Sequence, residues 1–290
     1  MAELILETID VEFTYPDGTR AIKGLCMAIE KGKKVAVLGP NGAGKSTLFL
    51  HFNGILRPGR GKIRFAGRDV SYGHAALMEL RKHVGIVFQD PDTQLFSASV
   101  LQEVSFGPLN LGLSREEALR RVERALEDTG VAELRNKPTH LLSFGQKKLV
   151  AIAGILAMEP SVLVFDEPTA WLDPKHSVMI FKLMERISRN GKTVVLSTHD
   201  ADLAFSWADY IYVLKDGVLA GEGTPEMVFQ DDALLQQAHL EKPWVLEVYN
   251  QLKGHGLLSP GIPVPRTKAQ LFGCIGDCLG KGRAKICHFS

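Results

Sequence analysis

A glycine-rich run that begins at residue 39 carries the residue types that bind phosphate. It fits the pattern G-x-x-x-x-G-K-[ST] and consists of Gly39, Pro40, Asn41, Gly42, Ala43, Gly44, Lys45, Ser46 and Thr47. Lys45 is expected to reach the β- and γ-phosphates, and the Ser46 hydroxyl to bind Mg²⁺. A chance glycine-rich turn is the alternative, but a strand pattern precedes the run and a helical pattern follows it. Because a helix N-terminus attracts phosphate, this context favours ATP or GTP binding.

A pair of adjacent carboxylates follows an apolar run further along the chain. The run is 162–165, and Asp166 and Glu167 come directly after it. A buried strand that ends in a carboxylate would place Asp166 beside the phosphate loop, where it can hold the Mg²⁺ of MgATP. Glu167 can then act as the general base that polarises the attacking water. An acidic pair at a solvated strand end is the alternative, which the presence of a phosphate loop disfavours.

The elements around these residues alternate between strand-like and helical patterns. Short apolar or β-branched runs predict parallel strands buried on both faces, for example at 162–165 and 193–197. A helix is predicted at 45–52, directly after the phosphate loop. Another is predicted at 115–130, where Ser114 and Glu117 form a capping box. The alternation indicates an α/β fold.

Further residues carry a specific resemblance to a known family. Leu142, Ser143, Phe144, Gly145 and Gln146 resemble the signature motif of the ATP-binding-cassette family. Four more elements follow the family's order: an adenine-stacking aromatic residue, a Q-loop glutamine, the end of a D-loop and a switch histidine, which are Tyr15, Gln89, Leu172–Asp173 and His199. The resemblance covers about residues 1–230. It implies a P-loop NTPase cassette with a mixed or parallel core sheet, an antiparallel β subdomain and a helical signature subdomain at about 90–160.

The resemblance also implies which residues act on the nucleotide. Glu167, His199 and Gln89 are the implied catalytic residues. Gln89 would join Ser46 and Asp166 around the Mg²⁺ of MgATP. The implied cofactors are therefore ATP and Mg²⁺.

The signature motif implies a second subunit. In this family Ser143, Gly145 and Gln146 bind the γ-phosphate of an ATP that the opposite subunit holds, and the helix N-terminus helps to bind that anion. The chain has a single copy of each element. A homodimer, or a heterodimer with a second cassette ATPase, is therefore expected.

Two residues depart from the usual family pattern. Phe144 stands where the signature usually has glycine, although cobalt-type importers are similar in carrying phenylalanine there. Trp171 stands where the D-loop generally has alanine or glycine. Because that loop crosses the dimer interface in the family, the indole would either fill a pocket or obstruct closure. We expect a Trp171→Gly variant to fold and to keep its ATPase activity.

The segments 88–97 and 104–112 indicate which subfamily the chain resembles. They look like the ATPases of energy-coupling-factor importers, and the run 142–154 is similar to the cobalt/nickel branch. In that family the segment after the Q-loop packs against coupling helices of a membrane subunit, which implies that Gln94, Leu95 and Phe96 contact a partner. The alternative is that Leu95 and Phe96 are core residues.

This resemblance implies ATP hydrolysis that energises import of cobalt or nickel. The implied partners are a transmembrane coupling subunit and a substrate-capturing membrane subunit. The implied location is peripheral, at the cytoplasmic face of a prokaryotic cell membrane. The shared motor of a vitamin importer is the main alternative. A non-transport cassette is disfavoured, since only 98 positions separate Lys45 from Ser143 and no coiled-coil pattern intervenes.

Composition limits the class of protein. The 290 residues are 45% hydrophobic and 23% charged, with a formal net charge of +1. These values exclude a disordered chain and a disulfide-stapled miniprotein, and they give no support for nucleic-acid binding. No apolar run approaches the roughly 18–20 residues of a membrane-spanning helix. The first residues show no secretory pattern.

The C-terminal part differs in composition from the rest. Residues 254–290 hold five basic residues against one acidic residue, and three of the four cysteines. We expect a cassette at 1–230, a helical extension at 231–253 and a flexible, basic Gly/Pro-rich tail at 254–290.

Cysteine and histidine residues outside the motifs are interpreted mainly as structural or surface residues. Cys274, Cys278, Cys287 and His288 could form a tetrahedral Zn²⁺ or Co²⁺ site, but a flexible tail with reduced thiols is the favoured alternative. Cys26 is expected to be a buried core thiol. Three further histidines are predicted to lie on the surface or at helix ends: His51, His74 and His140.

Overall fold

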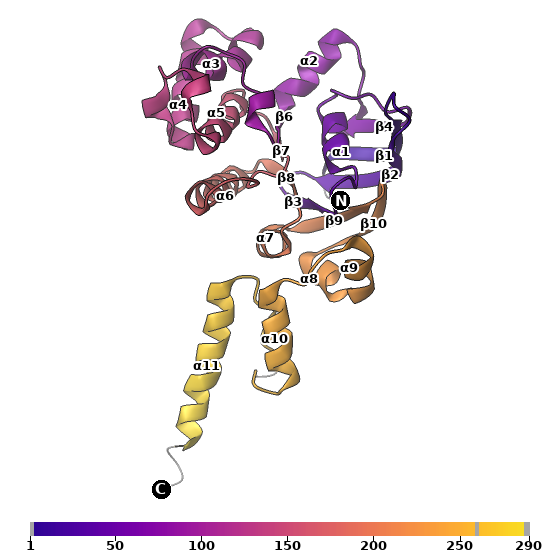
Figure 1. The fold of residues 1–290 in the computed structure, drawn as a ribbon, viewed down its shortest axis with the longest axis vertical. Helices are drawn as coiled ribbons and strands as arrows, with labels where there is room; N and C mark the ends of the chain where they lie inside the picture. The colour runs from indigo at the N-terminus through magenta and orange to yellow at the C-terminus, as the bar shows by residue number, and fades with distance from the viewer. Residues whose placement is uncertain (1–2, 259–260, 287–290) are drawn as a thin grey trace.

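The computed structural model describes residues 3–258 and 261–286, and its centre is a six-stranded sheet (Figure 1). The strand order is β10-β9-β3-β8-β7-β6. The pairs from β9 to β6 are parallel, whereas β10 pairs antiparallel with β9. The strands are Lys34–Leu38 (β3), Val84–Val87 (β6), Val162–Phe165 (β7), Thr193–Thr198 (β8), Tyr210–Lys215 (β9) and Val218–Gly223 (β10). The sheet is mixed, which confirms the predicted fold class.

Both faces of this sheet are buried, and alternate residues of its strands enter two hydrophobic clusters. Ala36 and Leu38 of β3 belong to the cluster shared with helix α6 (Pro174–Arg189) and the helical subdomain. Val35 and Val37 belong to the cluster shared with α1 (Lys45–Phe52) and the antiparallel sheet. A strand covered on both faces is apolar at every position, which explains the near-continuous apolar runs of the sequence.

A second, four-stranded antiparallel sheet has the order β2-β1-β4-β5. Its strands are Leu4–Thr14 (β1), Arg20–Glu30 (β2), Arg60–Phe65 (β4) and Arg68–Asp69 (β5). Side chains alternate between the two faces of a strand, and in β2 the buried face holds Leu25 and Met27. Cys26 lies between them on the exposed face. The prediction of a buried core thiol is therefore wrong.

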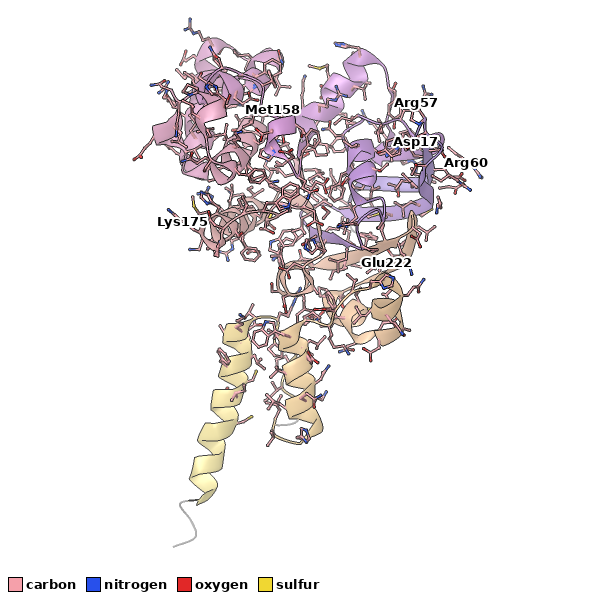
Figure 2. All side chains as sticks on the ribbon, viewed as in Figure 1. Asp17, Arg57, Arg60, Met158, Lys175 and Glu222 are labelled. Atoms are coloured by element: carbon pink, nitrogen blue, oxygen red, sulfur yellow. The ribbon has the colours of Figure 1, made fainter. Side chains whose placement is uncertain are left out.

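The helical subdomain, at the upper left of Figure 1, contains α3, α4 and α5. These helices are Val100–Asn110, Arg115–Thr129 and Phe144–Leu156, and α2 (His74–His83) precedes them. Three 3₁₀ turns lie between them: Pro91–Thr93 (η1), Ala132–Leu134 (η2) and Thr139–Leu141 (η3). Helix α3 lies close to the end of α5 at Gly107, where a Cβ atom would lie 2.7 Å from Cγ of Met158 (labelled in Figure 2).

The chain ends in helices at the lower end of the molecule in Figure 1. They are α8 (Pro225–Gln230), α9 (Asp232–Ala238), α10 (Trp244–Gly254) and α11 (Lys268–Ile286), whereas α7 (Ala201–Trp207) lies between β8 and β9 in the sequence. The tail predicted at 254–290 contains a helix over 268–286, which is not predicted from the sequence. The last proline, Pro265, precedes α11, Thr267 accepts a hydrogen bond from the Gln270 amide at its start, and Leu271 is buried.

The possible metal site of the tail is only partly within the described residues. Cys274 and Cys278 lie one turn apart on α11 and are half-buried, whereas Cys287 and His288 lie outside the described residues. Within 3–258 and 261–286, no group of three or more His, Cys, Asp or Glu residues is placed to hold a metal ion. The four-residue site therefore stays a prediction. Among the same residues, no helix combines the length and apolar character needed to cross a membrane.

Candidate nucleotide site

The phosphate loop joins the end of β3 to the start of α1. Its tight path requires glycine at two places. A Cβ atom on Gly39 would lie 2.1 Å from the carbonyl oxygen of Leu214, and one on Gly44 would lie 2.7 Å from that of Ala21. Gly44 also has a φ of 101°, in the region that favours glycine. The first amide groups of α1 have no side-chain cap, so they are available to an anion.

Lys45, the first residue of α1, is almost completely buried. Its Nζ donates to the carbonyl oxygens of Gly39 (2.6 Å) and Pro40 (3.1 Å) and lies 3.8 Å from Oε1 of Glu167. Burial lowers the pKa of Lys45, while Glu167 and Asp166 partly oppose that shift. The phosphate-loop lysine and the acidic pair therefore share one buried site.

The acidic pair lies at the end of β7 and is fixed by the neighbouring strand β8. Ser197 of β8 is fully buried, and its Oγ donates to Oδ1 of Asp166 (2.6 Å). The same Oγ accepts the amide of Glu167 (2.9 Å). Sequence reasoning missed Ser197, because its role depends on the order of strands in the sheet.

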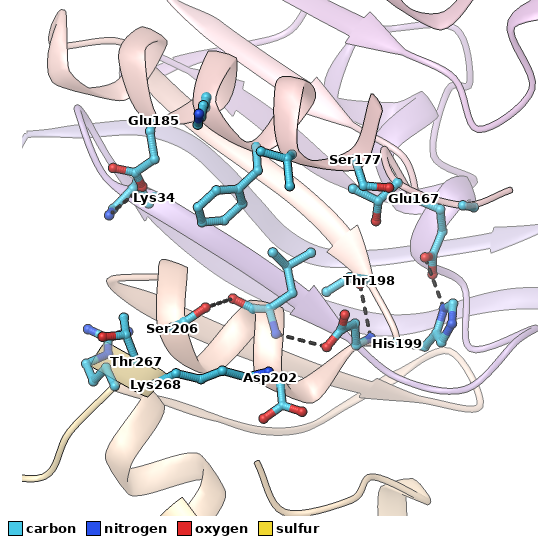
Figure 3. A pocket seen from close by; sticks show the side chains of 18 of the residues that line it. Lys34, Glu167, Ser177, Glu185, Thr198, His199, Asp202, Ser206, Thr267 and Lys268 are labelled. Atoms are coloured by element: carbon cyan, nitrogen blue, oxygen red, sulfur yellow. Dashed lines mark hydrogen bonds and ion pairs between the residues drawn. The ribbon is translucent and has the colours of Figure 1, made fainter. Parts of the chain in front are cut away.

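Glu167 and His199 lie within hydrogen-bond distance of each other at the mouth of the site (Figure 3). Nδ1 of His199 lies 3.1 Å from Oε2 of Glu167, while the His199 side chain remains 70% exposed. Oε1 of Glu167 is buried and makes no hydrogen bond to the described residues. Glu167 therefore has one oxygen held by the histidine and one directed to Lys45, an arrangement suited to a general base.

Tyr15 lies beside the start of α1, and its hydroxyl shares a hydrogen bond of 3.0 Å with Oγ1 of Thr47. Below it, His51 is completely buried and bonds through Nδ1 to the carbonyl oxygen of Thr47 (2.7 Å). The ring of Phe13 contacts both Tyr15 and His51 edge-to-face. His51 lies in the last turn of α1, as the helix-end alternative predicts, but it faces the core and not the surface.

A cleft of about 1480 Å³ opens beside these residues and continues between α6 and α7 (Figure 3). Asn41, Gln89, Glu167 and His199 all line its nucleotide end. The structure thus brings the predicted Q-loop glutamine, the second carboxylate and the switch histidine together.

The signature residues lie elsewhere in the chain. Ser143 caps the N-terminus of α5, where its Oγ accepts the amide of Gln146 and the Gln146 side chain accepts the amide of Ser143. Gly145 is buried, and a Cβ there would lie 2.6 Å from the His176 ring. None of the described residues that line the nucleotide cleft belongs to 143–146. The signature of one chain therefore does not line the cleft beside its own Glu167 and His199.

Comparison with known proteins identifies the family. The family model for ABC transporters matches residues 22–170. The energy-coupling factor transporter ATP-binding protein EcfA of Methanocaldococcus jannaschii is 52% identical over 250 residues, which cover 85% of this chain and 90% of that protein. The chain belongs to the energy-coupling factor ATP-binding proteins of the ABC transporter family. It is therefore an ABC ATPase coupled to transport.

Solved structures agree with the fold of this ABC cassette. The structure of cbiO1 from Clostridium perfringens, described as part of the ABC transporter complex cbiONQ, has a TM-score of 0.72 and 45% identity, and the match covers 87% of this chain and 99% of that one. A bacterial ABC transporter cassette solved as a dimer has a TM-score of 0.70 and 28% identity, with coverage of 76% and 99%. The cassette fold predicted from the motifs is thus confirmed.

Proposed function

We propose that this cassette hydrolyses ATP to energise import of a divalent metal ion, cobalt or nickel, through partner membrane proteins. The observation that carries the metal assignment is the run 142–154, which resembles the cobalt/nickel branch. The similarity to cbiO1, described as part of the complex cbiONQ, supports a transporter of the same type. The signature with Phe144, similar to the cobalt/nickel branch, agrees with this assignment.

The residues at the cleft fit a nucleotide bound with Mg²⁺. Ser46, Gln89 and Asp166 carry oxygen atoms, the ligands that Mg²⁺ prefers. Oε1 of Glu167 is buried without a hydrogen bond, which a water molecule beside the nucleotide would satisfy. When bound, Mg²⁺ would neutralise charge that develops on the phosphate oxygens.

Each proposed catalytic residue acts through a defined atom. Glu167 would accept the proton of the attacking water through Oε1, since Oε2 is held by His199. Lys45 would exchange the carbonyl oxygens of Gly39 and Pro40 for phosphate oxygens. This exchange removes little hydrogen bonding and pairs a buried cation with an anion, which is favourable.

The signature is proposed to complete the nucleotide site of a second cassette subunit. Ser143, Gly145 and Gln146 lie at the N-terminus of α5, whose partial positive charge suits a γ-phosphate. Their separation from the cleft of their own chain, together with the dimeric relative, supports this proposal. Tyr15, next to α1, is proposed to stack on the adenine base.

An apolar groove of about 350 Å³ in the helical subdomain is the proposed docking site for the transmembrane coupling subunit. Phe96 and Phe106 line it with rings 4.7 Å apart, and they are 65% and 48% exposed. The buried carboxylate of Glu103 fixes this rim by accepting the amides of Phe96 (3.0 Å) and Ser97 (2.7 Å). Exposed apolar surface of this kind suits an amphipathic helix.

All three residues predicted to contact the partner line this groove, but two of them also have internal roles. The Gln94 side chain bonds to the amide of Phe88 and the carbonyl oxygen of Ile86, both at 3.0 Å. Leu95 is partly buried against the core cluster. Phe96 is the member of the three that offers most of its surface to a partner.

The transported substrate is tested by uptake in cells that express the cassette with its coupling and substrate-capturing membrane proteins. We expect Co²⁺ or Ni²⁺ uptake that is lost in the Glu167→Gln variant. The names of the EcfA relatives state no substrate, so a shared vitamin motor is the alternative. Vitamin uptake without metal uptake would overturn the metal assignment and support that alternative. On this proposal the cassette is peripheral, at the cytoplasmic face of a prokaryotic cell membrane.

A further inference from the structure

Lys148 lies on α5, in the second turn after the signature, and is completely buried. Its Nζ donates hydrogen bonds to the carbonyl oxygens of Phe88 (2.9 Å) and Gln89 (2.5 Å). These two carbonyl groups lie where the chain leaves β6 and enters the Q-loop. The signature helix and the backbone of the Q-loop are therefore joined by one side chain.

A completely buried lysine is rare, because removing an ammonium group from water is costly. Burial lowers the pKa of Lys148 to about 8, and the carboxylates of Asp166, Asp90 and Glu167 partly oppose that shift. An apolar residue of similar volume would fill the same space without this cost. What such a residue would lack is the pair of donors to the Q-loop.

Neighbouring contacts fix the rest of the same loop. The Gln94 side chain bridges the amide of Phe88 and the carbonyl oxygen of Ile86. Lys147 pairs with Asp92 at 2.6 Å, although Asp92 is 57% exposed in this pair. Gln89 itself lines the nucleotide cleft, whereas Lys148 does not. The two hydrogen bonds of Lys148 therefore reach the nucleotide cleft through the Q-loop backbone.

We propose that Lys148 is a positioning residue of the ATPase reaction, which ties the Q-loop backbone to the signature helix and so holds Gln89 at the nucleotide. The inference rests on the proposed role of Gln89 in hydrolysis. A Lys148→Met variant keeps the length of the side chain and removes both hydrogen bonds. A Lys148→Arg variant keeps a donor and the charge.

The test compares steady-state ATP hydrolysis by the cassette dimer, formed by this chain alone or with a second cassette subunit, when this chain is unmodified or carries one of these variants, Gln89→Ala or the double substitution. We expect Lys148→Met to lower kcat by about tenfold, because two buried carbonyl groups lose their partner, and to change KM for ATP by less than about twofold. The Mg²⁺ concentration needed for half-maximal rate should rise. Lys148→Arg should recover most of kcat.

The double variant separates positioning from a structural effect. If Lys148 acts through Gln89, Lys148→Met should add no further loss of kcat to Gln89→Ala. Multiplied losses in the double variant, or a normal kcat in Lys148→Met, would overturn the inference. Lys147→Met is the matched control, and because it removes a partly exposed ion pair, we expect a change below about twofold. A Gln89→Ala variant with normal activity would instead overturn the proposed role of Gln89.

If Lys148→Met fails to fold, the same comparison of single and double variants with Lys148→Gln tests the positioning role. Its shorter amide side chain retains a donor but cannot span both carbonyl groups. An intermediate kcat, again with no added loss in the Gln89→Ala background, supports the positioning role. A rate equal to that of the unmodified chain contradicts it.

Discussion

The indole of Trp171 packs edge-to-face against the ring of Phe144, with ring centroids 5.8 Å apart. These are the two residues that depart from the usual family motifs, one in the D-loop and one in the signature. The contact joins the loop after Glu167 to the first residue of α5. Trp171 is 70% exposed and has a φ of 61°, a left-handed conformation that a bulky residue adopts only at a cost.

A Trp171→Gly variant should therefore fold and retain its ATPase activity. Glycine adopts the observed φ without strain, which offsets the loss of an aromatic contact worth about 0.5–1.5 kcal/mol. Thermal unfolding and ATP hydrolysis of the purified chain are the measurements. A Trp171→Ala variant keeps the strain and loses the contact, so it should be the less stable of the two. A large loss of activity in Trp171→Gly would show that the indole has an adapted role.

The core of the site could be predicted from local sequence patterns alone. The phosphate loop and the carboxylates at 166 and 167 are recognisable because strand, loop and helix are adjacent in the sequence. Ser197 could not be found in this way, since only the pairing of β7 with β8 brings it to Asp166. Long-range neighbours of this kind leave no local pattern.

The buried positions of two other polar residues could have been predicted from the helical periodicity of the sequence. Lys148 falls on the side of α5 that holds Leu149 and Ile152, and His51 falls on the side of α1 that holds Leu48 and Phe52, all of them buried. A polar residue on an apolar face predicts a buried hydrogen bond. The helix α11 could not be predicted in this way, because its several glycines favour an irregular chain over a helix.

Removing the Ser197 hydroxyl should weaken both stability and catalysis. Ser197→Ala leaves the buried amide of Glu167 without an acceptor and takes a donor from Asp166. We expect a loss of about 1–3 kcal/mol in the free energy of unfolding and a fall in kcat of about tenfold. Urea unfolding and ATP hydrolysis measure the two effects. Ser206→Ala, which removes a half-buried hydroxyl of α7, is the control, and equal effects of the two substitutions would contradict a specific role of Ser197.

His51 should make the protein less stable in weak acid. Burial lowers its pKa below the ordinary value of 6.5, and the bond to the carbonyl oxygen of Thr47 only partly opposes this shift. Since that carbonyl accepts, Nδ1 carries the proton, and protonation would fall on Nε2, which is buried without a partner among the described residues. Between its lowered pKa and 6.5 the unfolded chain binds more protons than the folded chain, so the free energy of unfolding decreases as the pH falls below 6.5.

The comparison that isolates this effect is between the unmodified chain and a His51→Gln variant. Glutamine does not titrate, so the urea midpoint of the variant should decrease less between about pH 7.5 and about pH 5.5. Parallel decreases in the two proteins would show that other groups account for the acid sensitivity.

The exposed phenylalanine pair of the docking groove should be needed for membrane association and not for folding. A Phe96→Ser, Phe106→Ser variant removes largely exposed rings, so the free energy of unfolding should change by about 1 kcal/mol or less. It should bind ATP normally but no longer co-sediment with membranes that contain the partner subunits. Leu119→Ser on α4 removes an exposed apolar residue outside the groove and is the control. Normal sedimentation of the double variant would contradict the proposed docking site.

ATP should bring two cassette subunits together once hydrolysis is blocked. Glu167→Gln removes the proposed base while keeping the shape of the side chain, so hydrolysis should fall by about 100-fold or more and the ATP-bound dimer should persist. Size-exclusion chromatography with MgATP should then show a dimer that is absent without nucleotide. As a control, adding Lys45→Ala to the Glu167→Gln variant should abolish this dimer, because the phosphate contacts of Lys45 are lost.

The same experiment decides the composition of the dimer. Dimerisation of the purified chain alone shows a homodimer, and dimerisation only after a second cassette subunit is added shows a heterodimer. Persistence of the monomer with MgATP in the presence of every cassette subunit of the transporter would contradict the shared site, since Ser143 would then have no nucleotide to contact.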